Sequence, residues 1–190
     1  TIASTGDIDA DGLVDLTATT GISTAGDITT TADAITFNSA TTLTGNVALD
    51  SAGGQIDFLS TLTGTTANTE TLTLTADAGA INFNAAVGTT SLGDVQIVSA
   101  SNVGIDSTFS TSDFEQLAGL GTTMIGAGGG LTATTGDVSV TTDSIALDGN
   151  IVATAGTGAV TLNADNGNSS GLGLVLSLIH ISEPTRHSAI

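Results

Sequence analysis

The stretch Leu72–Phe83, LTLTADAGAINF, sets the pattern that the rest of the chain repeats. Leu72 and Leu74 alternate with Thr, and after a short turn the alternation resumes with Ile81 and Phe83. Apolar residues at every second position are typical of a strand with one buried and one solvent-facing side. The stretch therefore predicts two short strands joined by the turn ADAG.

Three families of repeated motifs extend this pattern along the chain. The first has the form I-x-F, and its isoleucines, Ile35, Ile56 and Ile81, are 21 and 25 residues apart (56 − 35 and 81 − 56). That spacing is typical of the coils of a solenoid. The second family has Gly-Asp before Ile or Val, at Gly6–Ile8, Gly26–Ile28, Gly93–Val95 and Gly136–Val138. The third is an identical hexapeptide, LTATTG, at Leu16–Gly21 and Leu131–Gly136.

These repeats predict an all-β chain folded as a parallel β-helix, or β-solenoid, with coils of about 20–25 residues. A sandwich or barrel also has short, regularly spaced strands. The solenoid is favoured because the repeat length is nearly constant and the apolar pairs lie in units too short for long hairpins. Thr1–Val175 also lacks proline, so each of its residues has a backbone N–H to donate to a sheet. The solenoid predicts two internal columns of stacked side chains, Ile35, Ile56 and Ile81 in one and Phe37, Phe58 and Phe83 in the other.

One segment departs from the alternation. Asp113–Leu120, DFEQLAGL, places Phe114, Leu117 and Ala118 on one side if it is helical. The pattern is equally compatible with one helical turn and with a longer excursion of a coil.

The composition excludes several classes of function. The formal net charge is −18, which argues against nucleic acid and anionic lipid as partners. No stretch has the length of a membrane-spanning helix. The absence of cysteine is compatible with an oxidising exterior. Because the chain begins at Thr1 without a signal-peptide pattern, we expect an internal piece of a longer protein.

The C-terminal residues have a different character. Leu176–Arg186, LSLIHISEPTR, holds the only Pro and the only Arg of the chain, and both His lie in residues 176–190. The segment resembles the translation of a transposase-type sequencing adapter, and His187–Ile190 fits the frame in which such an adapter continues. We therefore expect residues 1–175 to be the β-solenoid segment and residues 176–190 to be an adapter-derived tail foreign to the fold.

The candidate sites in the sequence are acidic or hydroxylated. Aspartates of the Gly-Asp motifs supply oxygen ligands of the kind Ca²⁺ prefers, but such residues also simply form turns before strands. The calcium nonapeptide GGxGxDxUx is absent, because Leu131 follows Gly128–Gly130. Thr-x-Thr runs at Thr71–Thr75 and Thr17–Thr19 resemble ice-binding arrays, although the spacing is not kept at one place in successive coils.

Catalysis would require a pair of carboxylates, usually with a basic group nearby. Asp113 and Glu115 are close in sequence, but Thr1–Val175 contains no Lys or Arg. We expect Glu70 and Glu115 to be solvated surface groups. Asn168–Ser170 matches a glycosylation sequon, a triplet that arises often by chance. The sequence thus assigns no catalytic, cofactor-binding or metal-binding residue, and predicts that the chain is not an enzyme.

With the repeats laid out, the chain resembles the large bacterial surface proteins known as β-strand-repeat or filamentous-haemagglutinin-like adhesins. The residues that carry the resemblance are Gly79–Val103, Asp113–Gly129 and Val160–Gly167. The resemblance implies a right-handed parallel β-helix displayed outside the cell and exported by machinery encoded elsewhere in the parent chain. It implies no catalytic residues.

These observations together predict a structural and adhesive stalk segment of a secreted or surface-displayed bacterial protein. Its expected partners are host or matrix glycans and proteins, reached through the parent protein, and the neighbouring repeats of its own chain. The alternatives are a calcium-dependent extracellular binding module, with Ca²⁺ as its cofactor, and a polysaccharide-active β-helix.

Overall fold

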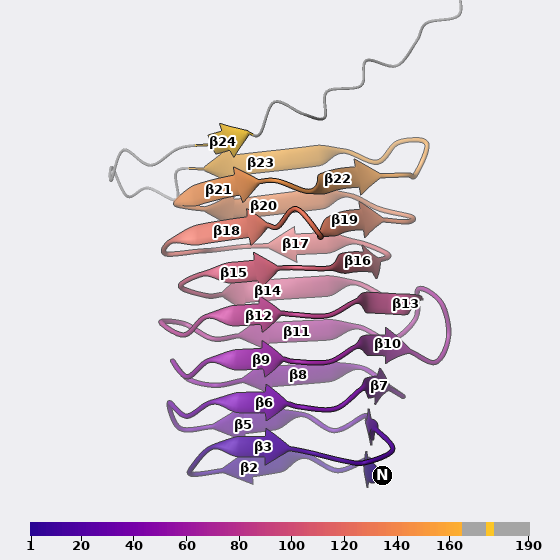
Figure 1. The fold of residues 1–190 in the computed structure, drawn as a ribbon, viewed down its shortest axis with the longest axis vertical. Helices are drawn as coiled ribbons and strands as arrows, with labels where there is room; N and C mark the ends of the chain where they lie inside the picture. Colours follow the sequence, from indigo (N-terminus) through magenta and orange to yellow (C-terminus); the bar gives the residue numbers. More distant parts are fainter. Residues whose placement is uncertain (165–173, 177–190) are drawn as a thin grey trace, which may run out of the picture.

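The chain folds as a β-solenoid of three parallel sheets that run the length of the stack (Figure 1). The computed structural model describes residues 1–164 and 174–176, and within them every regular element is a strand. Each sheet contains eight strands, and every pairing between neighbouring strands is parallel. The predicted fold class is therefore confirmed.

Each turn of the chain contributes one strand to each sheet. Sheet A consists of β1 (Ile2–Ser4), β4 (Ile22–Thr24), β7 (Thr41–Leu43), β10 (Leu62–Gly64), β13 (Val87–Leu92), β16 (Thr108–Thr111), β19 (Gly130–Ala133) and β22 (Asn150–Ala153). Sheet B consists of β2 (Ile8–Ala10), β5 (Ile28–Thr30), β8 (Val47–Asp50), β11 (Leu72–Thr75), β14 (Val95–Ser99), β17 (Phe114–Gln116), β20 (Val138–Thr142) and β23 (Val160–Ala164). Sheet C consists of β3 (Val14–Leu16), β6 (Ile35–Phe37), β9 (Ile56–Phe58), β12 (Ile81–Phe83), β15 (Val103–Ile105), β18 (Thr122–Ile125), β21 (Ser144–Leu147) and β24 (Leu174–Leu176).

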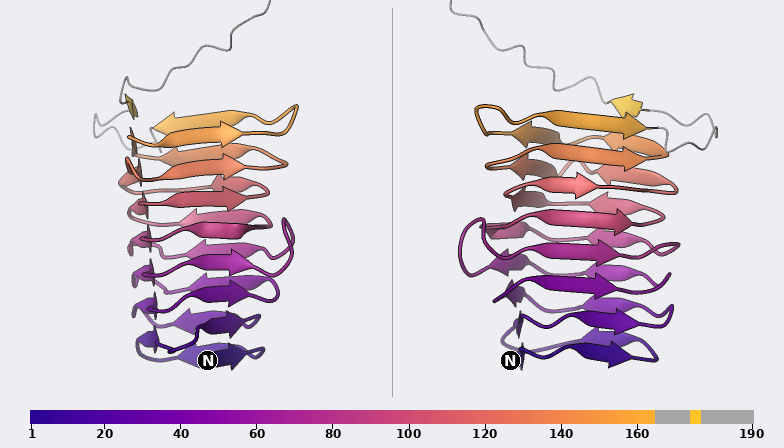
Figure 2. Two further views of the ribbon diagram at one scale, coloured as in Figure 1. Left: turned by 45° about the vertical axis from the view of Figure 1, so that its right-hand side comes forward. Right: turned by 180° about the vertical axis from the view of Figure 1, so that it is seen from behind.

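We number the coils by their three strands, so that coil 1 holds β1–β3 and coil 8 holds β22–β24. In Figure 1 the strands of sheet C cross the front from left to right, and those of sheet B return behind them as the chain rises. This is a right-handed winding, the hand that parallel crossover connections almost always take. The strands of each sheet lie one above another in all three views (Figures 1 and 2).

The core consists of like side chains stacked in files. Ile35 pairs with Ile56 and Ile56 with Ile81, and all three side chains are fully buried. In the adjacent file, the Phe58 ring stacks between those of Phe37 and Phe83, with centroids 5.0 and 5.2 Å apart. Both predicted columns are therefore confirmed. Because one coil cannot bury its own apolar residues, each coil depends on the next for its core.

The turn ADAG makes the corner between sheets B and C in coil 4. The Gly79 N–H donates to the Ala76 carbonyl at 2.7 Å, and Asp77 has a φ of +48°. Gly79 lies so close to coil 3 that a Cβ there would be 1.8 Å from the Gly54 carbonyl oxygen. The corner thus requires a residue without a side chain at this position.

Sheet A was not foreseen from the sequence. In several of its strands, one of the two inward-facing residues is small or polar. Examples are Thr41 in β7, Gly64 in β10 and Ala133 in β19. Such strands lack a pair of apolar residues at alternate positions, so they do not show the pattern on which the strand predictions rested.

The fold also decides two points that the sequence left open. The identical hexapeptides do not mark equivalent places, because Leu16 ends β3 of sheet C whereas Leu131 lies in β19 of sheet A. The Asp113–Leu120 segment contains a strand, β17, and not a helical turn. Phe114 replaces the aliphatic residue of its file, pairing with Val95 on one side and Val138 on the other. Burial of Phe114 in this file favours a strand, and this effect outweighs the weak helical pattern.

The expected domain boundary at 175/176 falls within β24. The remainder of the expected foreign tail, residues 177–190, and the sequon Asn168–Ser170 lie outside the described residues.

Candidate functional site

A file of acidic side chains follows the corner between sheets A and B. The Gly-Asp motifs lie directly before β2, β5, β14 and β20, and Asn46 and Asp113 take the same place before β8 and β17. The side chains accept backbone N–H groups of the next coil: Asp27 N–H donates to Asp7 Oδ1 at 2.9 Å, and Thr71 N–H donates to Asn46 Oδ1 at 3.1 Å. These residues therefore link successive coils as well as forming turns.

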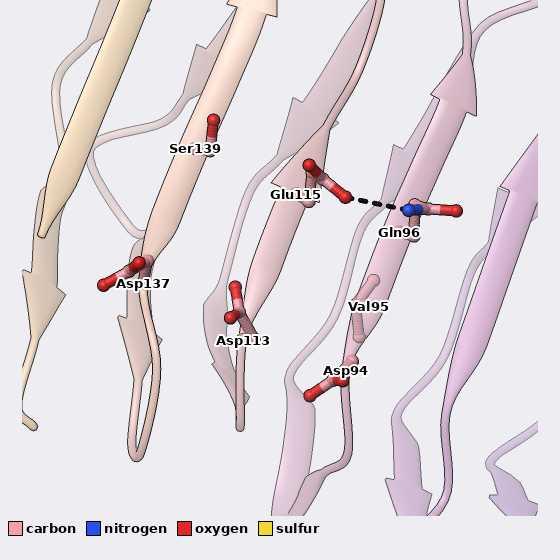
Figure 3. A pocket seen from close by; sticks show the side chains of 7 residues that line it. All are labelled: Asp94, Val95, Gln96, Asp113, Glu115, Asp137 and Ser139. Atoms are coloured by element: carbon pink, nitrogen blue, oxygen red, sulfur yellow. Dashed lines mark hydrogen bonds between the residues drawn. The ribbon is translucent and has the colours of Figure 1, made fainter. Parts of the chain in front are cut away.

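Four carboxylates of this region surround a shallow hollow of about 260 Å³ on the outer face of sheet B (Figure 3). Asp94, Asp113 and Asp137 come from the corners of coils 5, 6 and 7, and Glu115 lies on β17 between them. Gln96 Nε2 donates to Glu115 Oε2 at 2.8 Å. The sequence had singled out Asp113 and Glu115 as a pair of carboxylates, and Asp94 and Asp137 as aspartates of the Gly-Asp motifs. The fold brings these two sets of residues together.

The carboxyl group of Asp113 is the electrostatically unusual member. Burial raises its pKa above the ordinary aspartate value, and the charges of Asp94, Asp137 and Glu115 raise it further. The backbone N–H of Asp137 donates to this carboxylate and opposes the rise without cancelling it. The hollow therefore holds one carboxyl group that takes up a proton more readily than an ordinary aspartate.

The chemistry available to the hollow is limited by what lines it. Its other lining residues are Val95, Gln96 and Ser139. In the described part of the chain, no three His, Cys, Asp or Glu side chains converge in a way that would hold a metal ion. Neighbouring strands of a sheet lie about 4.8 Å apart, so the carboxylates of successive coils project outward from adjacent strands.

The Thr-x-Thr run on β11 does not extend into a flat hydroxyl array. Thr73 faces outward between Ala48 of β8 and Gln96 of β14 in the sheet register. An ice-binding surface requires threonine at the same place in successive coils, so the register excludes this array on β11.

Glu70 was expected to be a solvated surface group, and this expectation is wrong. Its side chain is only 4% exposed, because the loop between β10 and β11, to which Glu70 belongs, folds back over its carboxylate. No local pattern indicates this burial, because the loop is rich in exposed polar residues. Glu115 is half-buried and keeps an outward position on sheet B.

No phenylalanine ring is available at the surface for a ligand to stack on. The chain has five Phe and no Trp or Tyr, and all five Phe are at most 2% exposed. The described residues also contain no helix with the length and apolar character needed to cross a lipid bilayer. Comparison with protein-family models, with curated proteins and with solved structures found no match.

Proposed function

We propose that the chain is a stalk segment of a secreted or surface-displayed bacterial repeat protein, in which it serves as a rigid spacer. The observation that carries the proposal is the uninterrupted stack, in which each sheet pairs without a break from coil 1 to coil 8. The strands of each coil pair only with those of the neighbouring coils, so the length of the stack increases by a fixed step with each repeat. Length and stiffness are the properties that a spacer supplies.

The surface chemistry suits a spacer better than a receptor-binding module. The five phenylalanine rings are buried, whereas aromatic side chains at a surface are the usual platform for binding neutral ligands such as sugars. A net charge of −18 keeps neighbouring copies apart in solution. We therefore assign contacts with host or matrix glycans and proteins to other parts of the parent protein.

An adhesion experiment tests this proposal. The chain is placed between a surface anchor and a domain of known ligand, and cell attachment is compared with that of an anchor joined to the domain directly. We expect the chain to improve attachment to recessed ligands, and the chain displayed alone to bind no glycan or matrix protein in a saturable way. Saturable binding by the chain alone would overturn the spacer role in favour of a binding module.

The calcium-dependent alternative is tested by thermal unfolding of the chain in CaCl₂ and in excess chelator. A ligand that binds only the folded state raises the Tm as its concentration increases. We expect equal Tm values at matched ionic strength, and a higher Tm specific to Ca²⁺ would support the binding module.

The polysaccharide-active alternative rests on the acidic hollow, where Asp113 has a raised pKa beside carboxylates from two other coils. A general acid beside an ionised carboxylate is the arrangement that glycoside hydrolysis uses. We expect no release of reducing ends from neutral or acidic polysaccharides. Release that is lost in Asp113→Asn would establish the enzymatic alternative.

A further inference from the structure

The loop between β10 and β11 is longer than the corresponding corner in other coils. Seven residues, 65–71, separate β10 from β11 (72 − 64 − 1), whereas three residues, 25–27, separate β4 from β5 (28 − 24 − 1). Residues Thr65–Glu70, which we call the strap, project from the side of the stack beside β10 and β13 (Figures 1 and 2).

The strap runs along the solenoid axis and contacts coils beyond its own. The Asn68 N–H donates to the Ser91 carbonyl of coil 5 at 2.8 Å. Asn68 Oδ1 accepts from Thr134 Oγ1, in the corner after β19 of coil 7, at 2.8 Å. Asn68 itself has a φ of +61°, in the left-handed region that asparagine tolerates. The strap therefore connects coils 4, 5 and 7 through one residue at its tip.

Glu70 holds the base of the strap. Its carboxylate accepts the backbone N–H groups of Thr65 and Thr66, each at 3.2 Å, and also the Thr65 hydroxyl group. Its own carbonyl accepts the Gly93 N–H of coil 5 at 2.8 Å. A Cβ at position 64 would lie 2.5 Å from Glu70 Oε2, so Gly64 makes the space that the carboxylate fills.

From this geometry we propose that the strap is an acid-operated latch on the solenoid. The ionised Glu70 carboxylate gathers Thr65 and Thr66 and holds Asn68 against coils 5 and 7. A protonated carboxyl group is a weaker acceptor for these three donors, so protonation of Glu70 releases the strap while the three sheets below it stay paired. This latch is a property of the segment beyond the proposed spacer role, and it does not depend on that role.

The direction of the pH response follows from the hydrogen bonds. Burial raises the pKa of Glu70, but the hydrogen bonds from the Thr65 hydroxyl and the backbone N–H groups of Thr66, Glu70 and Thr65 outweigh it, so the pKa lies below the ordinary glutamate value. Asp94 lies in the adjoining corner of coil 5, but the causes of the shift are burial and hydrogen bonds, with no charge of a neighbouring carboxylate among them. The strap is therefore fully held above the ordinary glutamate pKa and is released as the pH falls through the lowered value.

A spin label tests the latch, because a chain without cysteine accepts one label at a chosen position. The label is attached through Ala67→Cys, at the exposed tip of the strap, and a reference label through Thr36→Cys on β6. We expect the strap label to be immobile at pH 7 and to become mobile on acidification, with the reference label unchanged. In Glu70→Gln the strap label should be mobile at pH 7.

Two further variants keep the test decisive. Glu115→Gln removes a half-buried glutamate elsewhere and should leave the strap label immobile at pH 7. Thr134→Ala removes the strap's contact with coil 7, together with the hydrogen bond from the Thr134 hydroxyl group to the Thr111 carbonyl. It should loosen the strap label without changing the reference label. An immobile strap label in both Glu70→Gln and Thr134→Ala at pH 7 would overturn the latch. So would simultaneous loosening of both labels on acidification, which would indicate that Glu70 supports the whole stack.

Discussion

The rings of Phe58 and Phe83 lie almost parallel, at an interplanar angle of 3° and a centroid separation of 5.2 Å. They occupy the same register position in successive coils, so the spacing of a parallel sheet sets the spacing of the rings. The next ring in contact, Phe109, belongs to sheet A and meets Phe83 edge-on, at 90°. The parallel stack therefore ends where Ile105 takes the following place in the file.

Truncation of the central ring should destabilise the solenoid strongly. Phe58→Ala removes a ring that contacts one neighbour on each face and leaves a cavity inside the stack, at an expected cost of about 3–5 kcal/mol. Urea unfolding measures this loss. The matched control is Leu59→Ala, at the next residue, whose side chain is 47% exposed and should contribute little. Equal losses for the two variants would contradict the role of the phenylalanine file.

Substitution of the corner glycine should also destabilise the stack, by a different mechanism. Gly79→Ala places a methyl group 1.8 Å from the Gly54 carbonyl oxygen, so coils 3 and 4 must separate locally. Overpacking of this kind typically costs about 1–3 kcal/mol. In Gly12→Ala the added methyl group meets no atom within 4 Å. We expect a lower Tm for Gly79→Ala and an unchanged Tm for Gly12→Ala. An unchanged Tm for Gly79→Ala would show that the corner relaxes without cost.

Neutralisation of Asp113 should stabilise the chain at neutral pH. The raised pKa means that the ionised carboxylate opposes folding, and this cost disappears as the pH falls through the raised value and the group takes up a proton. Asn46 shows that an amide oxygen accepts the next coil's N–H at this corner. We therefore expect a higher Tm for Asp113→Asn at pH 7, and a smaller difference from the unmodified chain at pH 3.

The control for this prediction is Asp7→Asn at the same corner of coil 1. Along the file of corner residues, Asp7 has an acidic neighbour on one side only, Asp27 of coil 2. Its effect on the Tm at pH 7 should be smaller than that of Asp113→Asn. A lower Tm for Asp113→Asn at pH 7 would show that the hydrogen bond outweighs the repulsion.

A polar pair in the core of coil 6 offers a fourth prediction. Thr123 Oγ1 donates to Gln116 Oε1 at 2.8 Å, while Gln116 Nε2 is buried without a hydrogen-bond partner among the described residues. Ile97 and Val140 flank Gln116 in the sheet register, so an apolar residue suits this file. Gln116→Leu alone leaves the Thr123 hydroxyl group without its acceptor, whereas Gln116→Leu with Thr123→Val removes both polar groups.

We expect the double variant to be more stable than Gln116→Leu by about 1–3 kcal/mol, the cost of one buried polar group left unpaired. Urea unfolding of the two variants and of Thr123→Val completes the cycle. Additive effects of the two substitutions would contradict a direct coupling between these side chains.

The sequence predicted both files of sheet C, and the strand of sheet B that holds Leu72 and Leu74, because two apolar residues alternate with polar ones in these strands. It did not predict sheet A, because Thr41, Gly64 and Ala133 fill inward positions there. The prediction that Glu70 is a solvated surface group was wrong, because its own loop folds back over its carboxylate. Local patterning does not encode such a contact. The four carboxylates of the acidic hollow were all named from the sequence, as a pair (Asp113 and Glu115) and as members of the Gly-Asp motifs (Asp94 and Asp137). That they surround one hollow depends on the stacking of coils 5 and 7 on coil 6.

The sequence by itself determined the period of the chain, the identity of the stacked residues and the acidic surface, because these follow from alternation and composition. Only the tertiary structure decided which corner each motif occupies, since the same hexapeptide lies on sheet C in one coil and on sheet A in another. It also decided the contact between Asn68 and Thr134, 66 residues apart in the chain. A contact of this kind depends on the path that a long loop takes along the stack, and no local pattern fixes that path.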